Sequence, residues 1–210
     1  MQPVRRLALM QGYHPVGLLE PCQQVAMLVH GTALAGCGVP TAPHAIFVTV
    51  DHGSTKCLGI HAARRATRFE ALEPLRQGVR ASFGAVAKDV ASGLKLRHDH
   101  GSQFVAHDYQ RELAFLGIES SPAFVREPEG NGCVERFIRT LKENLLWVRR
   151  FDTIEDLRQA LLAFKETYNH TWIVERHGYQ TPRRAAGSGS ACRARRETDT
   201  RPRRRCAVFP

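Results

Sequence analysis

Two fragments of the chain each hold one carboxylate where the backbone can direct it. Asp99 comes just past a predicted strand, in the fragment Arg97–Phe104, and Glu135 lies in the first turns of a predicted helix, in the fragment Gly130–Phe137. The interval between the two carboxylates is 35 residues. Sites that transfer phosphodiesters hold two divalent ions roughly 3.5 to 4 Å apart between converging carboxylates, and Mg²⁺ prefers oxygen ligands to His or Cys. The two fragments therefore predict part of a metal site.

The predicted helix from residue 131 to about 149 has an apolar face and a charged face. Its apolar residues recur at helical spacing and predict a continuous buried stripe: Val134, Phe137, Ile138, Leu141, Leu145 and Val148. The opposite face carries Asn131, Glu135, Arg139 and Lys142. Taken singly, an Asp after a strand is usually a turn residue, and a Glu–Arg pair four positions apart usually only supports its helix. Their combination favours a metal site beside a phosphate backbone.

The elements that must position these residues alternate between strands and helices. Short β-branched runs at 45–51 and 57–62 flank a turn and predict an antiparallel hairpin. A helical pattern follows over 67–83, where Pro74 and Gly78 predict a kink or two short helices. Further expected elements are a strand at 93–98, a helix at 106–116 ended by Gly117, a strand at 118–121, and a helix that begins after an N-cap at Thr153.

Composition limits the class of protein. The 210 residues suffice for one core with extensions, and a net charge of +10 favours a polyanionic partner. Nine Arg between residues 183 and 205 supply most of that charge; this Arg-rich end is read equally well as a nucleic-acid contact or as a solvated extension. Six scattered Cys without a Cys-x-x-Cys pair argue against structural zinc and favour a reduced, cytoplasmic protein. The sequence indicates neither a membrane span nor a signal peptide.

Three segments together resemble the integrase core of OrfB-type insertion-sequence transposases. They are His98–Phe104, Leu116–Ser121 and Glu135–Glu143. That group carries an Asp-Gly/Arg-Gly-Ser-Gln segment, a 35-residue interval, and a Glu followed seven residues later by Lys, and this chain has Lys142 at that place. Tyr168-Asn169 and the stretch Gly178–Pro182 also resemble the end of the group's core. The resemblance covers about two-thirds of the chain, from about Ile46 to Pro182.

The resemblance implies a fold, a site and partners. The implied fold is α/β and ribonuclease H-like, with a mixed five-stranded sheet and helices on both faces. It divides the chain into a poorly defined segment 1–26, an integrase catalytic core 27–182, and an Arg-rich, disordered tail 183–210. Asp99 and Glu135 become the second and third catalytic metal ligands, for Mg²⁺ or Mn²⁺ in the two-metal site of intact relatives, while Arg139 and Lys142 contact DNA. The partners implied are element-end and target DNA and further copies of a transposase, and the protein would be cytoplasmic, at the nucleoid when bound to DNA.

One ligand of the implied site is missing. The group's first Asp stands on the first strand in a segment of the type Trp-Gly-Thr-Asp-Leu, whereas this chain reads His-Gly-Thr-Ala-Leu, with Ala33 in place of the Asp. Asp51, at the end of the 45–51 strand, is either a replacement ligand or, more in keeping with its place before His52-Gly53, a turn residue. An Ala cannot coordinate a metal, so we expect impaired catalysis.

The favoured interpretation is an impaired transposase that acts in DNA integration and recombination. Three other interpretations stay open beside it. The chain could be a non-catalytic DNA-binding remnant that interferes with an active transposase, or a decayed gene product without function. Ribonuclease H-like nucleases of other families fit the 35-residue interval and the Lys142 position less well. His98 and His100 flank Asp99, but alternation along a strand directs both away from it. Cys133 is expected to be a helix-start residue, not a nucleophile.

Overall fold

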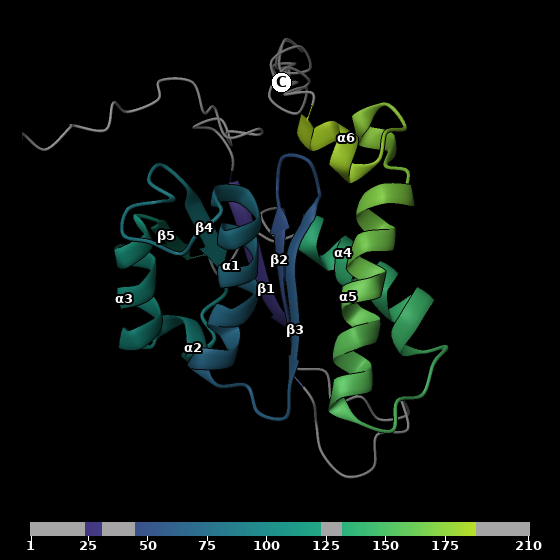
Figure 1. Ribbon diagram of the computed structural model, residues 1–210, viewed down its shortest axis with the longest axis horizontal. Coiled ribbons are helices and arrows are strands. Elements are labelled where there is room, and N and C mark those ends of the chain that lie inside the picture. The colour runs from purple at the N-terminus through teal and green to yellow at the C-terminus, as the bar shows by residue number, and fades with distance from the viewer. Residues whose placement is uncertain (1–23, 31–44, 123–131, 188–210) are drawn as a thin grey trace, which may run out of the picture.

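Five strands form one mixed sheet at the centre of the molecule (Figure 1). The computed structural model describes residues 24–30, 45–122 and 132–187, and of the first range the backbone alone. The strands lie in the order β3-β2-β1-β4-β5, and their bounds are β1 (Gln24–His30), β2 (Ala45–Asp51), β3 (Cys57–Ala63), β4 (Lys95–His98) and β5 (Glu119–Pro122). The pairs β1–β2 and β2–β3 are antiparallel, whereas the pairs β1–β4 and β4–β5 are parallel. The expected mixed five-stranded sheet is confirmed.

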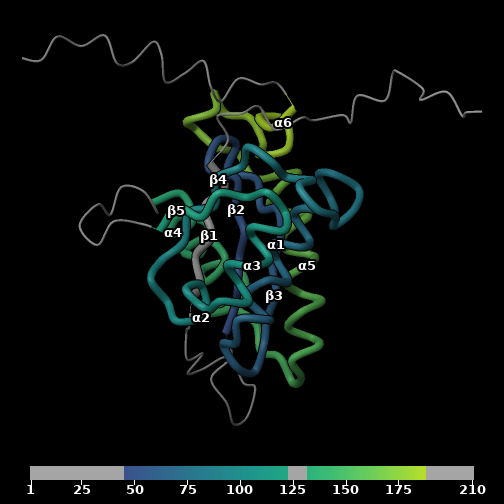
Figure 2. Tube along the Cα trace, turned by 90° about the vertical axis from the view of Figure 1, so that its left-hand side faces the viewer, coloured from purple at the N-terminus to yellow at the C-terminus, as the bar shows by residue number. Residues whose placement is uncertain are grey.

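Helices cover both faces of this sheet (Figures 1 and 2). On one face lie α1 (Arg68–Phe83), α2 (Ser102–Val105) and α3 (His107–Leu116), whose buried side chains form one core with alternate residues of β2, β3 and β4. On the other face lie α4 (Gly132–Leu141), a π-helical segment η2 (Lys142–Leu146) and α5 (Ile154–Thr171), with a second core around Val48, Phe137 and Leu161. Two cores separated by one sheet are the arrangement that the strand–helix alternation requires.

α1 is a single helix, although its sequence predicted a kink or two short helices. Thr67 caps its start by accepting a hydrogen bond from the Glu70 backbone N–H, and Gly84, with φ at 81°, ends it. Pro74 stays inside because the helix crosses β3 there at very close range. A Cβ at Gly59 would stand 1.9 Å from the Pro74 carbonyl oxygen. Packing against the sheet thus outweighs the cost of a proline in the helix, about 3 kcal/mol.

The helix that carries Glu135 changes its winding after ten residues. α4 buries Val134, Phe137, Ile138 and Leu141 as expected, but η2 then closes an i→i+5 turn in which the Trp147 N–H donates to the Lys142 carbonyl at 2.9 Å. The extra residue in this turn shifts the helical phase. Leu146 is therefore buried, and Val148, expected in the buried stripe, is 70% exposed.

The C-terminal part of the described chain extends past the boundary expected for the core. α5 begins with the predicted Thr153 cap, strengthened by a reciprocal bond with Asp156. After α5 come a 3-10 helix, η3 (Glu175–His177), and α6 (Pro182–Gly187), in which Ala185 is buried. The expected disordered tail from 183 is thus wrong for its first five residues, which are helical. No described helix is long and apolar enough to cross a membrane.

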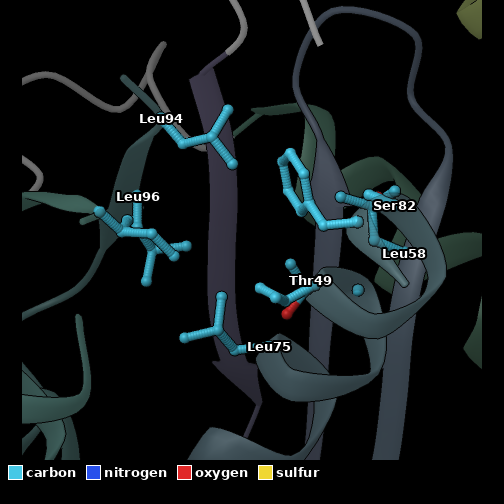
Figure 3. A pocket seen from close by; sticks show the side chains of 10 residues that line it. Thr49, Leu58, Leu75, Ser82, Leu94 and Leu96 are labelled. Carbon is cyan, nitrogen blue, oxygen red and sulfur yellow. The ribbon is translucent and has the colours of Figure 1, made fainter. Parts of the chain in front are cut away.

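An apolar pocket lies on the α1 face of the sheet, alongside β1 (Figure 3). In this view Leu96 lies on one side of β1 and Thr49 and Leu58 lie on the other, while the side chains of Leu94 and Leu75 lie across the strand. Thr49 is 1% exposed, and its hydroxyl has no hydrogen-bond partner among the residues whose side chains the structure describes. The pocket is on the face of the sheet opposite α4 and is therefore separate from the predicted site.

Candidate functional site

The carboxyl end of β4 is fixed by a buried histidine. His98 is 1% exposed and packs against the rings of Phe104 and Tyr109. Its Nδ1 lies 2.7 Å from the Asp99 carbonyl and its Nε2 lies 2.8 Å from the Ser120 hydroxyl. A carbonyl only accepts, so Nδ1 donates to it, and Nε2 shares a hydrogen bond with the Ser120 hydroxyl. Both ring nitrogens are thus engaged in hydrogen bonds within the protein.

Asp99 follows directly, half-buried at the edge of the sheet. One of its carboxylate oxygens, Oδ1, accepts a hydrogen bond from the Gly101 backbone N–H at 2.8 Å. Its negative charge adds to burial in raising the pKa of Tyr109, although burial is the larger cause. Leu96 and His98 both pack into the α1–α3 core, and Asp99 follows immediately after the last residue of β4.

Glu135 lies in the first turn of α4, exposed to solvent on the side opposite the buried stripe. Arg139 shares this exposed side and pairs with Glu143, with its Nε 2.9 Å from the carboxylate Oε1. Such a surface pair four residues apart contributes only about 0.3–0.5 kcal/mol, so it leaves the guanidinium available to another anion. Lys142, one turn further, is half-buried where η2 begins, and it takes part in an interaction of its own.

The described residues do not complete a metal site. Asp99 follows a strand of the sheet and Glu135 lies on a helix that covers it, but no group of three or more His, Cys, Asp or Glu in the described ranges could hold an ion. Two carboxylates are the oxygen donors that Mg²⁺ prefers, yet they are fewer than a two-metal centre uses. The fit to Mg²⁺ or Mn²⁺ is therefore partial. Ala33 and Asn131 lie outside the described residues.

Asp51 is a turn residue whose carboxylate is hydrogen-bonded within its own turn. It is 1% exposed, and its carboxylate accepts from the backbone N–H groups of Gly53 and Ser54, both at 3.0 Å, and from the Ser54 hydroxyl. In the sheet it pairs with Val25, which is level with Leu96 of β4. Asp99 is three residues further along and two strands away, which places the two Cα atoms roughly 14 Å apart.

Both described cysteines are unreactive by environment. Complete burial raises the pKa of Cys57 to about 12. Burial likewise raises the pKa of Cys133, although the nearby Arg176 guanidinium opposes that effect. Because the thiolate is the nucleophile, the expectation that Cys133 is a helix-start residue and no nucleophile agrees with this environment.

The sequence indicated no contact for two polar residues of the C-terminal region. Asn169 is buried and binds the start of β3. Its side chain accepts a hydrogen bond from the Cys57 N–H and donates one to the Cys57 carbonyl, both at 2.9 Å. Arg176 is exposed and donates to the carbonyls of His52 and Gly53. Asn169 lies directly after Tyr168 on the apolar face of α5, and a polar residue there was a usable signal. No sequence signal pointed to the contacts of Arg176, because its partners are backbone atoms more than 120 residues away in the sequence.

The integrase core domain family matches residues 116–182, about a third of the chain. The matched range includes Glu135, Arg139 and Lys142 and begins after Asp99. This part of the chain is therefore similar to an integrase core domain. It is 34% identical over 79 residues to the transposase for insertion sequence element IS904 of Lactococcus lactis, and 28% identical over 89 residues to the putative transposase InsD for insertion element IS2E of Escherichia coli. These matches cover 38% and 40% of this chain but only 31% and 39% of those two proteins.

Solved integrase catalytic cores share the fold of this chain. The catalytic core domain of BIV integrase superposes with a TM-score of 0.56 at 19% identity, over 80% of this chain and 97% of that one. The HTLV-2 integrase catalytic core domain in complex with magnesium gives a TM-score of 0.53 at 16% identity, over 77% and 95% of the two chains. At such identities the likeness establishes the ribonuclease H-like architecture alone. The expected fold is thus confirmed.

Proposed function

We propose that this integrase core acts in DNA transposition as part of a transposase-type polynucleotidyl transferase. The observation that supports the proposal is that Asp99 directly follows β4 and Glu135 lies in the first turn of α4, a helix that packs over β1 and β2. The curated relatives are transposases of insertion elements, which supports DNA as the substrate. Asp99 and Glu135 would be the metal-binding carboxylates, and Arg139 and Lys142 would hold phosphates.

The same proposal includes impaired catalysis. The interval from residue 21 to residue 50 contains neither Asp nor Glu, so no alignment of the first strand within it supplies a carboxylate. Ala33 is the position that the transposase resemblance assigns to the first ligand, and the Asp51 carboxylate is held within its own turn. A divalent cation bound by Asp99 and Glu135 would supply positive charge beside a phosphate, but the chain lacks the third carboxylate of intact relatives.

DNA binding by the charged face of α4 is the direct test of the proposed substrate. The affinity of the full chain for a mixed-sequence duplex should fall steeply with salt, because each neutralised phosphate releases counterions. Replacing Lys142 with Gln should lower the slope of log affinity against log salt by about 1. Lys88→Gln is the matched control, since Lys88 is an exposed lysine in the segment after α1. Equal slopes for all three proteins would remove Lys142 from the interface.

A second function follows from the incomplete carboxylate set. A core that binds DNA without cutting it would interfere with an active transposase by occupying element ends or by forming mixed multimers. This function predicts that Glu135→Gln leaves duplex affinity unchanged and that the chain inhibits an active relative in trans. An intact, catalytically competent core predicts the opposite for inhibition: added chain would increase the yield of joined product.

A further inference from the structure

The π turn of η2 changes which residues the end of this helix presents to solvent. In a regular α-helix, Trp147 would lie roughly 120° from Glu135 around the helix axis. The i→i+5 turn takes up one extra residue, so Trp147 lies within roughly 20° of Glu135 instead. The Arg149 N–H donates to the Leu145 carbonyl at 3.1 Å, so the helical path continues through Trp147. The π turn therefore brings Trp147 onto the exposed side of the helix that carries Glu135.

Trp147 is unusually exposed for a tryptophan. Its relative exposure is 68%, and that of the neighbouring Val148 is 70%. Within the described ranges its indole makes no hydrogen bond and no ring contact, whereas Trp172 is half-buried against Tyr168, with ring centroids 6.0 Å apart. Tryptophan is usually well buried, and π turns inside helices are frequent at functional sites. A helix that changes its winding and so exposes Trp147 indicates a surface for a partner.

The residues around Trp147 carry positive charge. From Arg139 to Arg150 the chain holds four basic residues and one acidic residue, Glu143, for a net charge of +3. Glu143 pairs with Arg139, and the next acidic residue in the chain is Asp152. Arg149 and Arg150 are both exposed. An aromatic ring among exposed cations is the arrangement that binds single-stranded nucleic acid, because bases stack on the ring while phosphates meet the cations.

We propose that Trp147 is a stacking platform for an unpaired DNA base, on the same exposed side of the helix as Arg139. The faces of paired bases are covered by their neighbours, so the platform takes a base of a single strand or of an opened duplex end. Arg149 and Arg150 lie beside the ring and meet the phosphates of the same strand. The proposal rests on DNA as the proposed substrate, and it adds a contact roughly 18 Å along the helix from Glu135.

A second copy of this chain fits the surface around Trp147 less well. In a two-fold contact between identical chains, the same patch lies on both sides of the interface. The net positive charge would then face itself, and like charges opposed across an interface cost free energy. Phosphates would neutralise the same charge. Charge complementarity therefore favours DNA over self-association at this surface.

Tryptophan fluorescence tests the stacking contact, because the chain has only two tryptophans. In Trp172→Phe, Trp147 is the sole tryptophan emitter. An oligodeoxythymidine of about 12 nucleotides should quench this emission, since a stacked base quenches an indole, and a duplex of the same length should quench it less. Should Trp172→Phe not fold, the difference in quenching between the wild type and Trp147→Phe reports the same contact. Binding of the oligonucleotide, followed by the anisotropy of a label on it, without quenching of Trp147 would overturn the proposal.

The affinity for the same oligonucleotide gives a second measurement. Trp147→Ala should weaken binding by about fivefold to 150-fold, which corresponds to the loss of one stacked base. Trp147→Phe keeps a ring and should lose less. Phe69→Ala is the matched control, because Phe69 is a 58% exposed aromatic residue of α1, on the opposite face of the sheet, and it should bind as the wild type does. Equal affinities of the wild type and Trp147→Ala would contradict the stacking role.

The outcomes distinguish the base contact from the proposed function. A wild type that binds neither the oligonucleotide nor the duplex removes the DNA substrate and the base contact together. Binding with a salt slope that depends on Lys142, and an affinity that does not depend on Trp147, removes the base contact and leaves the DNA substrate. If Trp147→Ala lowers the mass measured by sedimentation while its DNA affinity is unchanged, the surface serves self-association and the proposal is wrong.

Discussion

At the scale of single residues, buried polar groups determine where the site residues stand. Both ring nitrogens of His98 are hydrogen-bonded at the end of β4, and the Asp51 carboxylate is hydrogen-bonded to the backbone of its own turn. Each of these residues looked like a possible ligand beside Asp99 in the sequence. The structure gives them other roles, because a buried polar group must find hydrogen-bond partners nearby. His98 bonds a backbone carbonyl and Ser120, and Asp51 bonds backbone N–H groups.

Asn169 gives the sharpest residue-scale prediction on stability. Its side-chain amide hydrogen-bonds both the N–H and the carbonyl of Cys57 on the outer edge of β3. Asn169→Ala leaves two buried groups unpaired and should lower the free energy of unfolding by about 2–4 kcal/mol, measured by urea denaturation. Asn144→Ala removes an exposed amide that donates to the Thr140 carbonyl at 2.9 Å, and it should cost less than about 0.5 kcal/mol. Equal effects of the two changes would contradict the role of Asn169.

The buried Cys57 thiol predicts how stability depends on pH. Its pKa is about 12 in the folded chain and 9.0 in the reference state, so above pH 9 the unfolded chain loses a proton that the folded chain keeps. Stability is therefore complete below pH 9 and falls as the pH rises toward 12. Cys57→Ser should make this fall shallower by up to about 1.4 kcal/mol per pH unit. Urea denaturation at pH 9, 10 and 11 measures the slope, and identical slopes for both proteins would contradict the assignment.

At the scale of elements, the pattern of apolar residues predicted most helices and strands correctly. The hairpin of β2 and β3, the Gly117 end of α3 and the Thr153 cap of α5 all follow from local signals that act within a few residues. The errors arose where distant contacts decide. α1 remains one helix because Pro74 meets Gly59 on β3, and the π turn exposes Val148 by shifting the helical phase. Neither effect produces a repeating pattern in the sequence from which it could be predicted.

The contact between α1 and β3 predicts opposite outcomes for two glycines. Gly59→Ala would place a methyl group 1.9 Å from the Pro74 carbonyl, so the helix must move away from the sheet, at a cost of about 3 kcal/mol or more. Gly132→Ala, at the start of α4, meets nothing within 4 Å and should change stability by less than about 1 kcal/mol. Thermal unfolding of both variants measures the difference. A well-tolerated Gly59→Ala would mean that α1 does not approach β3 this closely.

At the scale of the whole molecule, the sheet separates two layers of helices. The α1–α3 layer encloses the pocket beside Thr49, whereas α4, which carries Glu135, and α5 cover the other face. The sequence predicted this ribonuclease H-like fold because its motifs are local ones of a known kind, and the roles of Asp99 and Glu135 stay predictions. It did not predict the contacts of Arg176, whose backbone partners lie more than 120 residues away in the sequence.

We propose that this chain, which is similar to integrase cores, has lost its first catalytic carboxylate. Nicking of supercoiled plasmid in Mn²⁺ by the purified full chain tests it most directly, with Glu135→Gln as the inactive reference and Ala33→Asp as the restored site. Circular dichroism confirms that all three proteins are folded. We predict that the wild type nicks no faster than Glu135→Gln and that Ala33→Asp nicks in a Mn²⁺-dependent manner. Mn²⁺-dependent nicking by the wild type that Glu135→Gln abolishes would contradict the account.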